Sequence, residues 1–464
     1  MNAPVIWIVI PGLLAFTLFW LRYWYRISVL VGALAAGFLA LLAGILPVGQ
    51  AIHLYPLSFE ISETLSVLGR RFVLSNADRP LLALIYLLAA YWFGAAYIAR
   101  AGRLYVPMGM AVVALLTAAL AVDPFLYSAL FIEVAVLVSI PMLVLPGKTV
   151  SRGVLRFLVF ETIGTTFILF TGWMLSGIET NPADADIILR STSLLGFAFM
   201  ILLAVFPFHT WILILAEETH AYAVIFILVM LPLMISMLGL DFLNRYAWLR
   251  ETGQAYLLLR WAGVLMVSVS GIWAAFEKHL GRVLGYAVMM EIGYTLLTMG
   301  LRGGYPWYFE MLLPRVIALG TCALGLTYLQ SHFPDLRIET LRGAGRSMPF
   351  ASAAVILSLF SIAGLPLLAG FPLRLMVWEN LAAQSLWGVF LAGVGSVGMA
   401  VVGLRALAVL VMGADEEPWR ITEPWPFLFY LGTGMLVIVL IGILPQWLLT
   451  PLTAALRAFP SLSP

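Results

Sequence analysis

Charge is the scarcest property of this 464-residue chain. Only 10% of its residues are Asp, Glu, Lys or Arg, and 63% are hydrophobic, whereas soluble globular proteins average about 25% charged residues. So few charges cannot cover the surface of a water-soluble protein of this length. The composition therefore excludes a nucleic-acid-binding protein, a disordered scaffold and a cytosolic multidomain enzyme, and it predicts a polytopic membrane protein.

Cysteine and lysine are almost missing as well. The one cysteine, Cys322, lies in an apolar stretch, which excludes disulfides, cysteine-rich zinc sites and iron–sulfur clusters. Only Lys148 and Lys278 of the 25 basic residues are lysines. We find no phosphate-binding loop, dinucleotide fingerprint or hydrolase motif. We therefore expect no catalytic centre, no cofactor and no metal, so that any redox chemistry belongs to partner subunits.

Long apolar blocks dominate what is present. About fourteen blocks suit membrane helices, which need ~20 residues, and their approximate centres are residues 12, 37, 89, 114, 135, 166, 203, 231, 266, 292, 318, 365, 399 and 438. The pattern predicts an all-α membrane protein, since a transmembrane β-barrel would alternate in short runs. Arg22 and Arg26 follow the first block, so we expect a retained helix and not a cleaved signal peptide. Residues 66–74 have a strand-like pattern that predicts a short hairpin on the outer face.

Basic residues are distributed unevenly between the loops. Alternate loops carry thirteen Lys and Arg on one side of the predicted membrane and seven on the other. By the positive-inside rule the richer side is cytoplasmic. We expect Lys148, Arg152, Arg156 and Arg420 on that side and Arg70 and Arg71 on the other. Both termini then lie on the outer (periplasmic) face of a bacterial-type inner membrane.

Two predicted helices, the seventh and the twelfth, are interrupted by proline. Pro207 and Pro366 lie 159 residues apart, and Glu133 and Glu291 in the fifth and tenth helices lie 158 apart. A shared offset of five helices predicts an inverted repeat of the kind found in transporters, and prolines that only kink helices are the alternative. We divide the single membrane domain into N-terminal helices with an outer loop, two repeats and a C-terminal helix, with bounds 1–100, 105–242, 256–412 and 427–464.

Ionisable residues within the apolar blocks are the candidate functional groups. A charge at the centre of a membrane helix costs ~2.5–3.5 kcal/mol, so it persists when it is paired or lines a polar path. Glu133 and Glu291 lie near mid-helix, which favours a proton relay, with a fixed Glu–Arg pair as the alternative. Glu161 is either a relay or an interfacial residue. Structural roles are expected for the charged residues nearer helix ends or local partners, which are Arg260, Glu310, Arg315 and Arg405.

Further polar residues follow the break in the seventh helix. His209 lies just past Pro207 and is equally suited to a structural role and to a relay. Glu217, Glu218 and His220 form a small polar cluster. A proton mouth or a solvated loop fits this cluster better than a metal site, because Glu-Glu-Thr-His lacks the spacing of a known ligand set.

Three stretches resemble a known family. They are residues 206–211 (Phe-Pro-Phe-His-Thr-Trp), 277–294 (from Glu-Lys-His-Leu-Gly-Arg to Gly-Tyr) and 364–371 (from Gly-Leu-Pro to Gly-Phe). Together they are similar to motifs of the antiporter-like membrane subunits of respiratory complex I (NADH:quinone oxidoreductase), which are related to subunits of Mrp-type cation/proton antiporters. The resemblance covers nearly the whole chain. It implies fourteen helices with an inverted repeat, partner membrane subunits and a lateral proton path.

The chain departs from that family at the proton path. The family pairs a helix-five Glu with a helix-seven Lys and continues through Lys or His on helix eight to Lys or Glu on helix twelve. Glu133 matches the first group, but the following positions fall on Leu202, near Met234 and on Arg374. Arginine stays protonated and carries protons poorly. We expect Arg374 to be buried and paired with free carbonyls or a carboxylate, for which Glu379 is a candidate.

The sequence is compatible with three functions. The first is a proton-translocating antiporter-like subunit of a complex I-like assembly. The second is a non-conducting structural spacer in such an assembly. The third is a subunit of a related Mrp-like or inorganic-carbon-uptake complex. In each case the expected partners are other membrane subunits and lipid, without nucleic acid, and the expected proton pathway comprises Glu133, Glu161, His209, Glu291 and Arg374.

Overall fold

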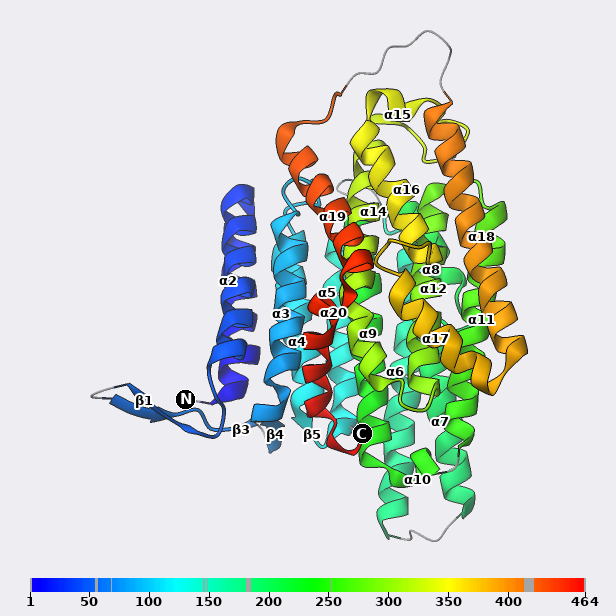
Figure 1. Ribbon diagram of the computed structural model, residues 1–464. Coiled ribbons are helices and arrows are strands. Elements are labelled where there is room, and N and C mark those ends of the chain that lie inside the picture. The colour runs from blue at the N-terminus through cyan, green and yellow to red at the C-terminus, as the bar shows by residue number, and fades with distance from the viewer. Residues whose placement is uncertain are drawn as a thin grey trace.

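The computed structural model describes residues 2–54, 57–67, 69–144, 147, 149–180, 185–251, 253–412 and 421–462. Lys148 and Arg420, which contribute to the loop count, lie outside these described residues. The described part is an elongated bundle of helices that run mostly parallel to one axis (Figure 1). Both chain ends lie at the same end of the bundle, beside the strands.

Helices make up nearly all of the bundle. In chain order they are α1 (Ile10–Trp20), α2 (Tyr25–Ile45), α3 (Arg79–Gly94), α4 (Tyr105–Ala121), α5 (Ser128–Leu143), α6 (Arg152–Thr180), α7 (Ala185–Leu202), α8 (Thr210–Glu218), α9 (Ala221–Arg245), α10 (Ala247–Glu251), α11 (Gln254–Phe276), α12 (Leu280–Gly300), α13 (Tyr305–Glu310), α14 (Leu312–His332), α15 (Ala344–Ser347), α16 (Pro349–Ala363), α17 (Phe371–Gln384), α18 (Leu386–Val411), α19 (Trp425–Ile443) and α20 (Pro445–Leu449). A π-helical turn, Val5–Val9, precedes α1.

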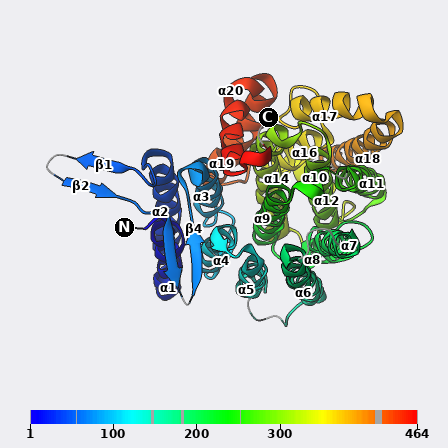
Figure 2. The same cartoon turned by 90° about the horizontal axis from the view of Figure 1, so that it is seen from below.

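The apolar blocks coincide with these helices. Within the described residues, 9 helices are long and apolar enough to cross a membrane, and four shorter apolar helices accompany them. All but two of the predicted centres fall inside a helix, and those two, 203 and 365, fall in interruptions after α7 and α16. The predicted all-α, polytopic membrane fold is confirmed. In cross-section, α9 and α12 lie among the other helices (Figure 2), and their membrane-spanning windows are 100% buried.

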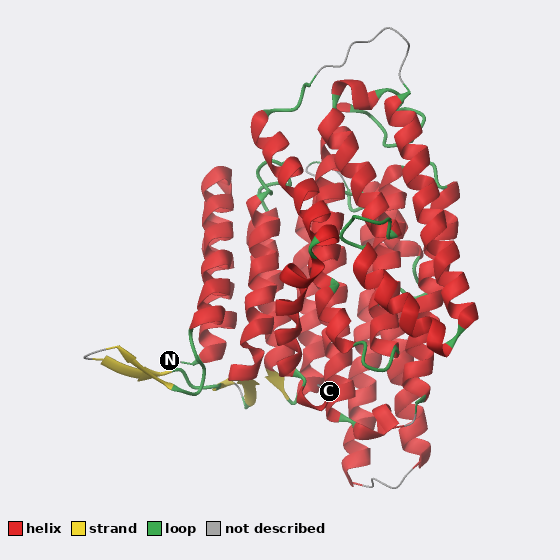
Figure 3. Ribbon diagram, viewed as in Figure 1, coloured by secondary structure: helices red, strands yellow, loops and turns green. Residues whose placement is uncertain are grey.

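The strands form two small antiparallel sheets at one end of the bundle (Figure 3). β1 (Ala51–Leu54) pairs with β2 (Leu57–Glu60), and β3 (Thr64–Val67) pairs with β4 (Arg70–Val73), which also pairs with β5 (Val122–Asp123). The predicted hairpin around residues 66–74 is therefore present. The β1–β2 hairpin was not predicted from the sequence.

Both broken helices end in the same backbone motif. After α7, Ala204 has φ 50°, the N–H of Val205 donates to Met200 O at 2.8 Å, and the N–H of Ala204 donates to Ile201 O at 3.0 Å. After α16, Gly364 has φ 81°, and the N–H groups of Leu365 and Gly364 make the equivalent bonds to Phe360 O and Ser361 O, both at 3.0 Å. This is the Schellman helix end.

The two interruptions also match in length and spacing. Helix α8 begins at Thr210, eight positions after α7 ends at Leu202, and α17 begins at Phe371, eight positions after α16 ends at Ala363. The ends of α7 and α16 are therefore 161 residues apart, and the starts of α8 and α17 are also 161 residues apart. Because the breaks free backbone groups in mid-membrane, they must be covered by protein.

Candidate functional site: polar groups inside the bundle

A buried ion pair lies next to the break between α16 and α17. Arg374 Nη2 of α17 lies 2.5 Å from Glu291 Oε1 of α12, and Arg374 Nη1 donates to Ser361 O at 2.5 Å. The guanidinium carbon lies 4.6 Å from the ring centroid of Tyr294. Arg374 is 2% exposed. Its carboxylate partner is Glu291, not Glu379, so the expected pairing is correct in kind but wrong in partner.

A second arginine reaches the same carboxylate. Arg315 of α14 places Nε 3.5 Å from Glu291 Oε2, and its Nη2 donates to Glu291 O at 3.1 Å and to Thr295 Oγ1. Arg315 is buried in the first turn of α14, and its pairing with Glu291 is the kind of structural contact expected of a charged residue near a helix end. Arg315 points from α14 toward α12, and the spacing of residues along the sequence does not predict this contact. Two permanent positive charges therefore surround one carboxylate.

The aromatic ring of Tyr294 packs against the guanidinium group of Arg374. Its hydroxyl group is 3.1 Å from Ser396 Oγ of α18, and Trp378 Nε1 of α17 donates to it at 3.2 Å. These bonds join α12, α17 and α18 around the ion pair. The second half of the chain therefore contains a rigid, largely satisfied network.

Glu133 of α5 lies between two threonines of α6. Thr162 Oγ1 donates to Glu133 Oε1 at 2.7 Å, and Thr165 Oγ1 donates to Glu133 Oε2 at 2.8 Å. The residue is half-buried. Among the described residues these hydroxyls are its hydrogen-bond partners, and the alternative of a fixed Glu–Arg pair finds no arginine there.

Glu161 is completely buried on α6, with 0% exposure. Both of its carboxylate oxygens lack a hydrogen-bond partner within the described part of the chain. Thr165 Oγ1 lies 3.1 Å from Glu161 O while it also reaches Glu133. The bond to Glu161 is to its main-chain carbonyl, one turn earlier in α6, so Thr165 contacts the side chain of Glu133 but not that of Glu161.

Apolar residues separate the acidic first half from the charged second half. Leu202 is buried at the end of α7 and packs on Gly164 of α6, where an added Cβ would lie 2.5 Å from Leu202 Cδ2. Met234 is buried within α9. Between α7, α9, α11 and α12, with Leu203 and Leu296 among its lining residues, lies an apolar cavity of about 360 Å³.

His209 lies alone in the break between α7 and α8. Its ring stacks on Phe206, with centroids 5.3 Å apart and planes at 25°. It is 8% exposed, and its Nδ1 has no hydrogen-bond partner among the described residues. The structure does not bring His209 into contact with either acidic cluster.

The polar residues after the seventh helix make separate contacts. Arg282 Nε donates to Glu217 Oε2 at 2.6 Å, whereas Glu218 Oε2 accepts from the N–H of Gly153 at 2.8 Å and caps α6. Burial lowers the pKa of His220 to about 4, against a smaller opposing effect of the Ala99 backbone. No group of three or more His, Cys, Asp or Glu that could hold a metal occurs in the described part.

Sequence reasoning missed several of these contacts. The hydroxyl partners of Glu133 carry no sequence signal, because threonines are frequent on membrane helices. Arg405 does have the expected structural role: its Nη1 donates to the carbonyls of Ala275 and Glu277 at the end of α11. A cation there complements the carboxyl end of a helix.

Comparison with known proteins finds relatives that match part of the chain. The chain is 23% identical over 331 residues to NADH-quinone oxidoreductase subunit N of Dehalococcoides mccartyi, covering 64% of this chain and 67% of that protein. It is 30% identical over 192 residues to NADH-quinone oxidoreductase subunit 14 of Thermus thermophilus, but there the match covers only 41% of this chain and 44% of the relative. Several such matches span less than two thirds of the relative.

Solved structures share the fold along the whole chain. An Mrp complex from Dietzia sp. contains a chain with a TM-score of 0.79 and 19% identity, and 99% of this chain and 98% of that chain are covered. Respiratory complex I from Thermus thermophilus with bound NADH contains one with a TM-score of 0.73 and 20% identity, covering 98% and 99%. A sequence profile described as "NADH:quinone oxidoreductase/Mrp antiporter, TM" matches residues 130–400. The chain therefore belongs to the NADH:quinone oxidoreductase/Mrp antiporter membrane family.

Proposed function

We propose that this chain is a proton-translocating, antiporter-like membrane subunit of a multi-subunit complex I-like assembly. The observation that carries the proposal is the presence of buried carboxylates in both halves of the bundle, Glu161 in the first and Glu291 in the second. Ionisable groups this deep in a membrane protein are costly and mark ion or proton pathways. Family membership supports the same function, because named relatives are subunits of NADH-quinone oxidoreductase.

The proposed pathway uses the two halves differently. In the first half Glu133 and Glu161 exchange protons, with Thr165 hydrogen-bonded to Glu133 and His209 at the break. In the second half Glu291 and Arg374 form the charged pair. Three residues at one end of the bundle, Glu217, Glu218 and His220, are proposed as the proton mouth.

A non-conducting spacer is the second candidate. It is favoured by the apolar centre, where Leu202 and Met234 replace titratable groups, and by the two arginines around Glu291. Fixed positive charge inside a pore opposes the passage of protons and cations. On this hypothesis the chain keeps the fold and subunit contacts and adds no proton flux.

Replacement of the buried Glu161 carboxylate distinguishes a proton-translocating subunit from a non-conducting spacer. Glu161→Gln keeps the shape and removes the exchangeable proton, and Glu379→Gln on α17 serves as the matched control. In the assembled complex reconstituted into vesicles, a conducting chain predicts fewer protons moved per electron in Glu161→Gln and an unchanged ratio in the control. An unchanged ratio in Glu161→Gln, with assembly intact, favours the spacer and contradicts the first proposal.

The type of complex is tested by its composition. Related folds occur in an Mrp complex and in an archaeal membrane-bound sulfane sulfur reductase, and an Mrp-like or inorganic-carbon-uptake complex is the alternative assembly. Subunits that co-purify with the chain distinguish these assemblies. Quinone-reducing and NADH-oxidising subunits would support the complex I-like assignment, and their absence from an intact complex would contradict it.

We also propose the inverted repeat, with halves 105–242 and 256–412, and a bacterial-type inner membrane with both termini outside. The equal offset of the two breaks supports the repeat, and the excess of basic residues in one set of loops supports the orientation. Single cysteines at Val150 and Arg70 test the orientation in a variant without Cys322. We expect them to react from opposite sides of the membrane, and reaction from one side would refute the orientation.

A further inference from the structure

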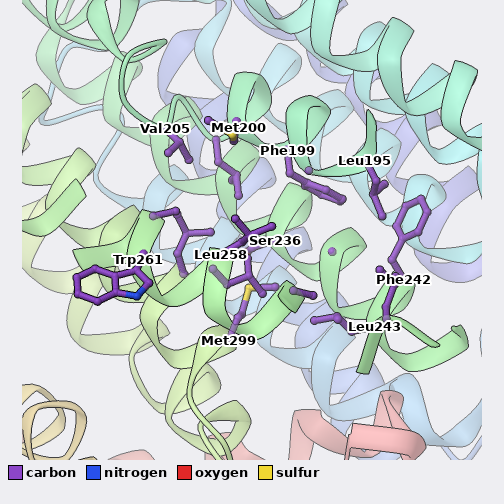
Figure 4. Close-up of a pocket in the computed structure, with 18 of the residues that line it drawn as sticks. Leu195, Phe199, Met200, Val205, Ser236, Phe242, Leu243, Leu258, Trp261 and Met299 are labelled. Carbon is purple, nitrogen blue, oxygen red and sulfur yellow. The ribbon is translucent and has the colours of Figure 1, made fainter. Parts of the chain in front are cut away.

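The cavity between α7, α9, α11 and α12 has the size of a ligand site. Its volume is about 360 Å³, within the range of roughly 300–1,000 Å³ of small-molecule pockets. Phe199 and Met200 of α7, Phe242 of α9, Leu258 of α11 and Met299 of α12 line it (Figure 4). Val205 and Phe206, which lie in the break after α7, line the end of the cavity nearest that break.

The lining selects an apolar occupant. Among the described residues that line it, only Thr192 and Ser236 bear a hydroxyl group, and the others are apolar apart from the indole N–H of Trp261. The Ser236 hydroxyl is already used, because it donates to Leu233 O at 2.7 Å and lies 2.7 Å from the Tyr308 hydroxyl. A buried water needs two to four polar partners, and cavities without them stay dry. Water or a polar solute therefore finds few hydrogen-bond partners in this cavity.

The cavity opens through the apolar surface of the bundle. Leu258 is 64% exposed, and Trp261 and Leu265 are each 40% exposed, although all three line the cavity. Exposed apolar side chains continue along the same helix at Leu257 and Trp273. In a chain that belongs to a membrane family, the medium outside this mouth is lipid hydrocarbon.

The cavity is elongated along the membrane normal. Its lining on α11 runs from Ala255 to Leu265, which at 1.5 Å per residue is roughly 15 Å along the helix axis. That is about half of the ~30 Å hydrocarbon core, or one leaflet. It extends from Leu249, at the end of the bundle that holds the termini, to the break in mid-helix.

We propose that one acyl chain of a membrane phospholipid occupies this cavity. The chain enters from the leaflet at the α10 end, between α7 and α11, and its methyl end contacts Val205 and Phe206. An occupied cavity keeps water out of the space between α7, α9, α11 and α12, so the lipid adds to the apolar region between the two polar clusters. The proposal does not depend on whether the chain conducts protons.

Photocrosslinking of the full chain in its membrane complex tests this site. The probe is a phosphatidylethanolamine with a diazirine near the end of one acyl chain, in vesicles of bacterial phospholipid. Gly196→Phe fills the mouth, because Gly196 lines the cavity and an added Cβ there meets nothing within 4 Å. Gly393→Phe on α18 is the matched control, since its Cβ is equally unobstructed but lies outside the cavity.

We expect crosslinks on the peptides that carry Phe199 and Leu258, reduced several-fold in Gly196→Phe and unchanged in Gly393→Phe. If Gly196→Phe does not accumulate, Leu258→Phe blocks the opposite wall of the mouth. Equal labelling of the cavity and of the α18 surface would overturn the proposal, as would labelling that the blocking variant leaves unchanged. Preferential labelling by an isoprenoid-tail probe, or occupation by a neighbouring subunit, would also overturn it.

Discussion

Arg374 Nη2 lies 2.5 Å from Glu291 Oε1, although 83 positions separate the two residues along the chain. The contact exists because the break after α16 lets α17 restart beside α12, with Arg374 one turn into the new helix. Arg315 approaches the same carboxylate from α14. The second half of the bundle is therefore organised around one buried carboxylate and two guanidinium groups.

Loss of Glu291 should destabilise the protein more than loss of Arg374. Breaking a buried ion pair by removing one partner costs about 3–5 kcal/mol, because the other charge stays unpaired. Glu291→Gln leaves two unpaired arginines, whereas Arg374→Met leaves Glu291 with Arg315. Thermal unfolding of the purified variants measures the difference. A lower melting temperature for Arg374→Met than for Glu291→Gln would contradict this account.

A lysine should be tolerated better at position 202 than at position 234. Leu202 packs on Gly164, one turn from Glu161, whose carboxylate has no hydrogen-bond partner in the described chain. An ammonium group there gains a counter-ion, whereas Met234→Lys places a charge, at a cost of about 2.5–3.5 kcal/mol, in an apolar stretch of α9. The yield of folded protein in membranes compares them. Similar yields for both variants would argue against a free carboxylate beside α7.

Acid should destabilise the protein through His220. Burial lowers its pKa to about 4, while an unfolded histidine has a pKa near 6.5. Between these values the unfolded state binds a proton that the folded state does not, so the free energy of unfolding falls as the pH drops from about 6.5 to 4. His220→Gln should flatten this dependence in thermal unfolding. The variant His332→Gln, which changes an exposed histidine, should leave this pH dependence unchanged. Identical pH profiles of stability for the unmodified protein and both variants would refute the assignment.

Removal of the Glu423 side chain should cost more stability than removal of the Glu218 side chain. Glu423 is 5% exposed and accepts from the N–H groups of Phe350 and Ala351 at 2.9 and 3.1 Å, at the start of α16. Glu218 is exposed and accepts one bond from Gly153. Loss of a helix cap costs roughly 0.5–2 kcal/mol. Melting temperatures of the two alanine variants test the order, and a larger loss for Glu218→Ala would contradict it.

Particular residues show how far sequence reasoning reached. The apolar blocks predicted the membrane helices, because a bilayer demands about 20 apolar residues for each crossing. Pro207 and Pro366 located both breaks, since proline removes a helical hydrogen bond. The burial of Arg374 followed from its place after the proline break, at a position where the resembled family has Lys or Glu, but its partner did not. Glu379 is near in sequence, whereas Glu291 is near in space.

The sequence by itself determined that the chain spans a membrane, where its helices lie and that lysine is missing from its centre. These properties follow from composition and local hydrophobic pattern. Only the tertiary structure decided which helices meet: that Arg315 joins Glu291, that Thr162 and Thr165 hold Glu133, and that an apolar cavity lies between the halves. Contacts between distant segments depend on how all the helices pack together, and the apolar faces that drive insertion into a membrane do not distinguish one neighbouring helix from another.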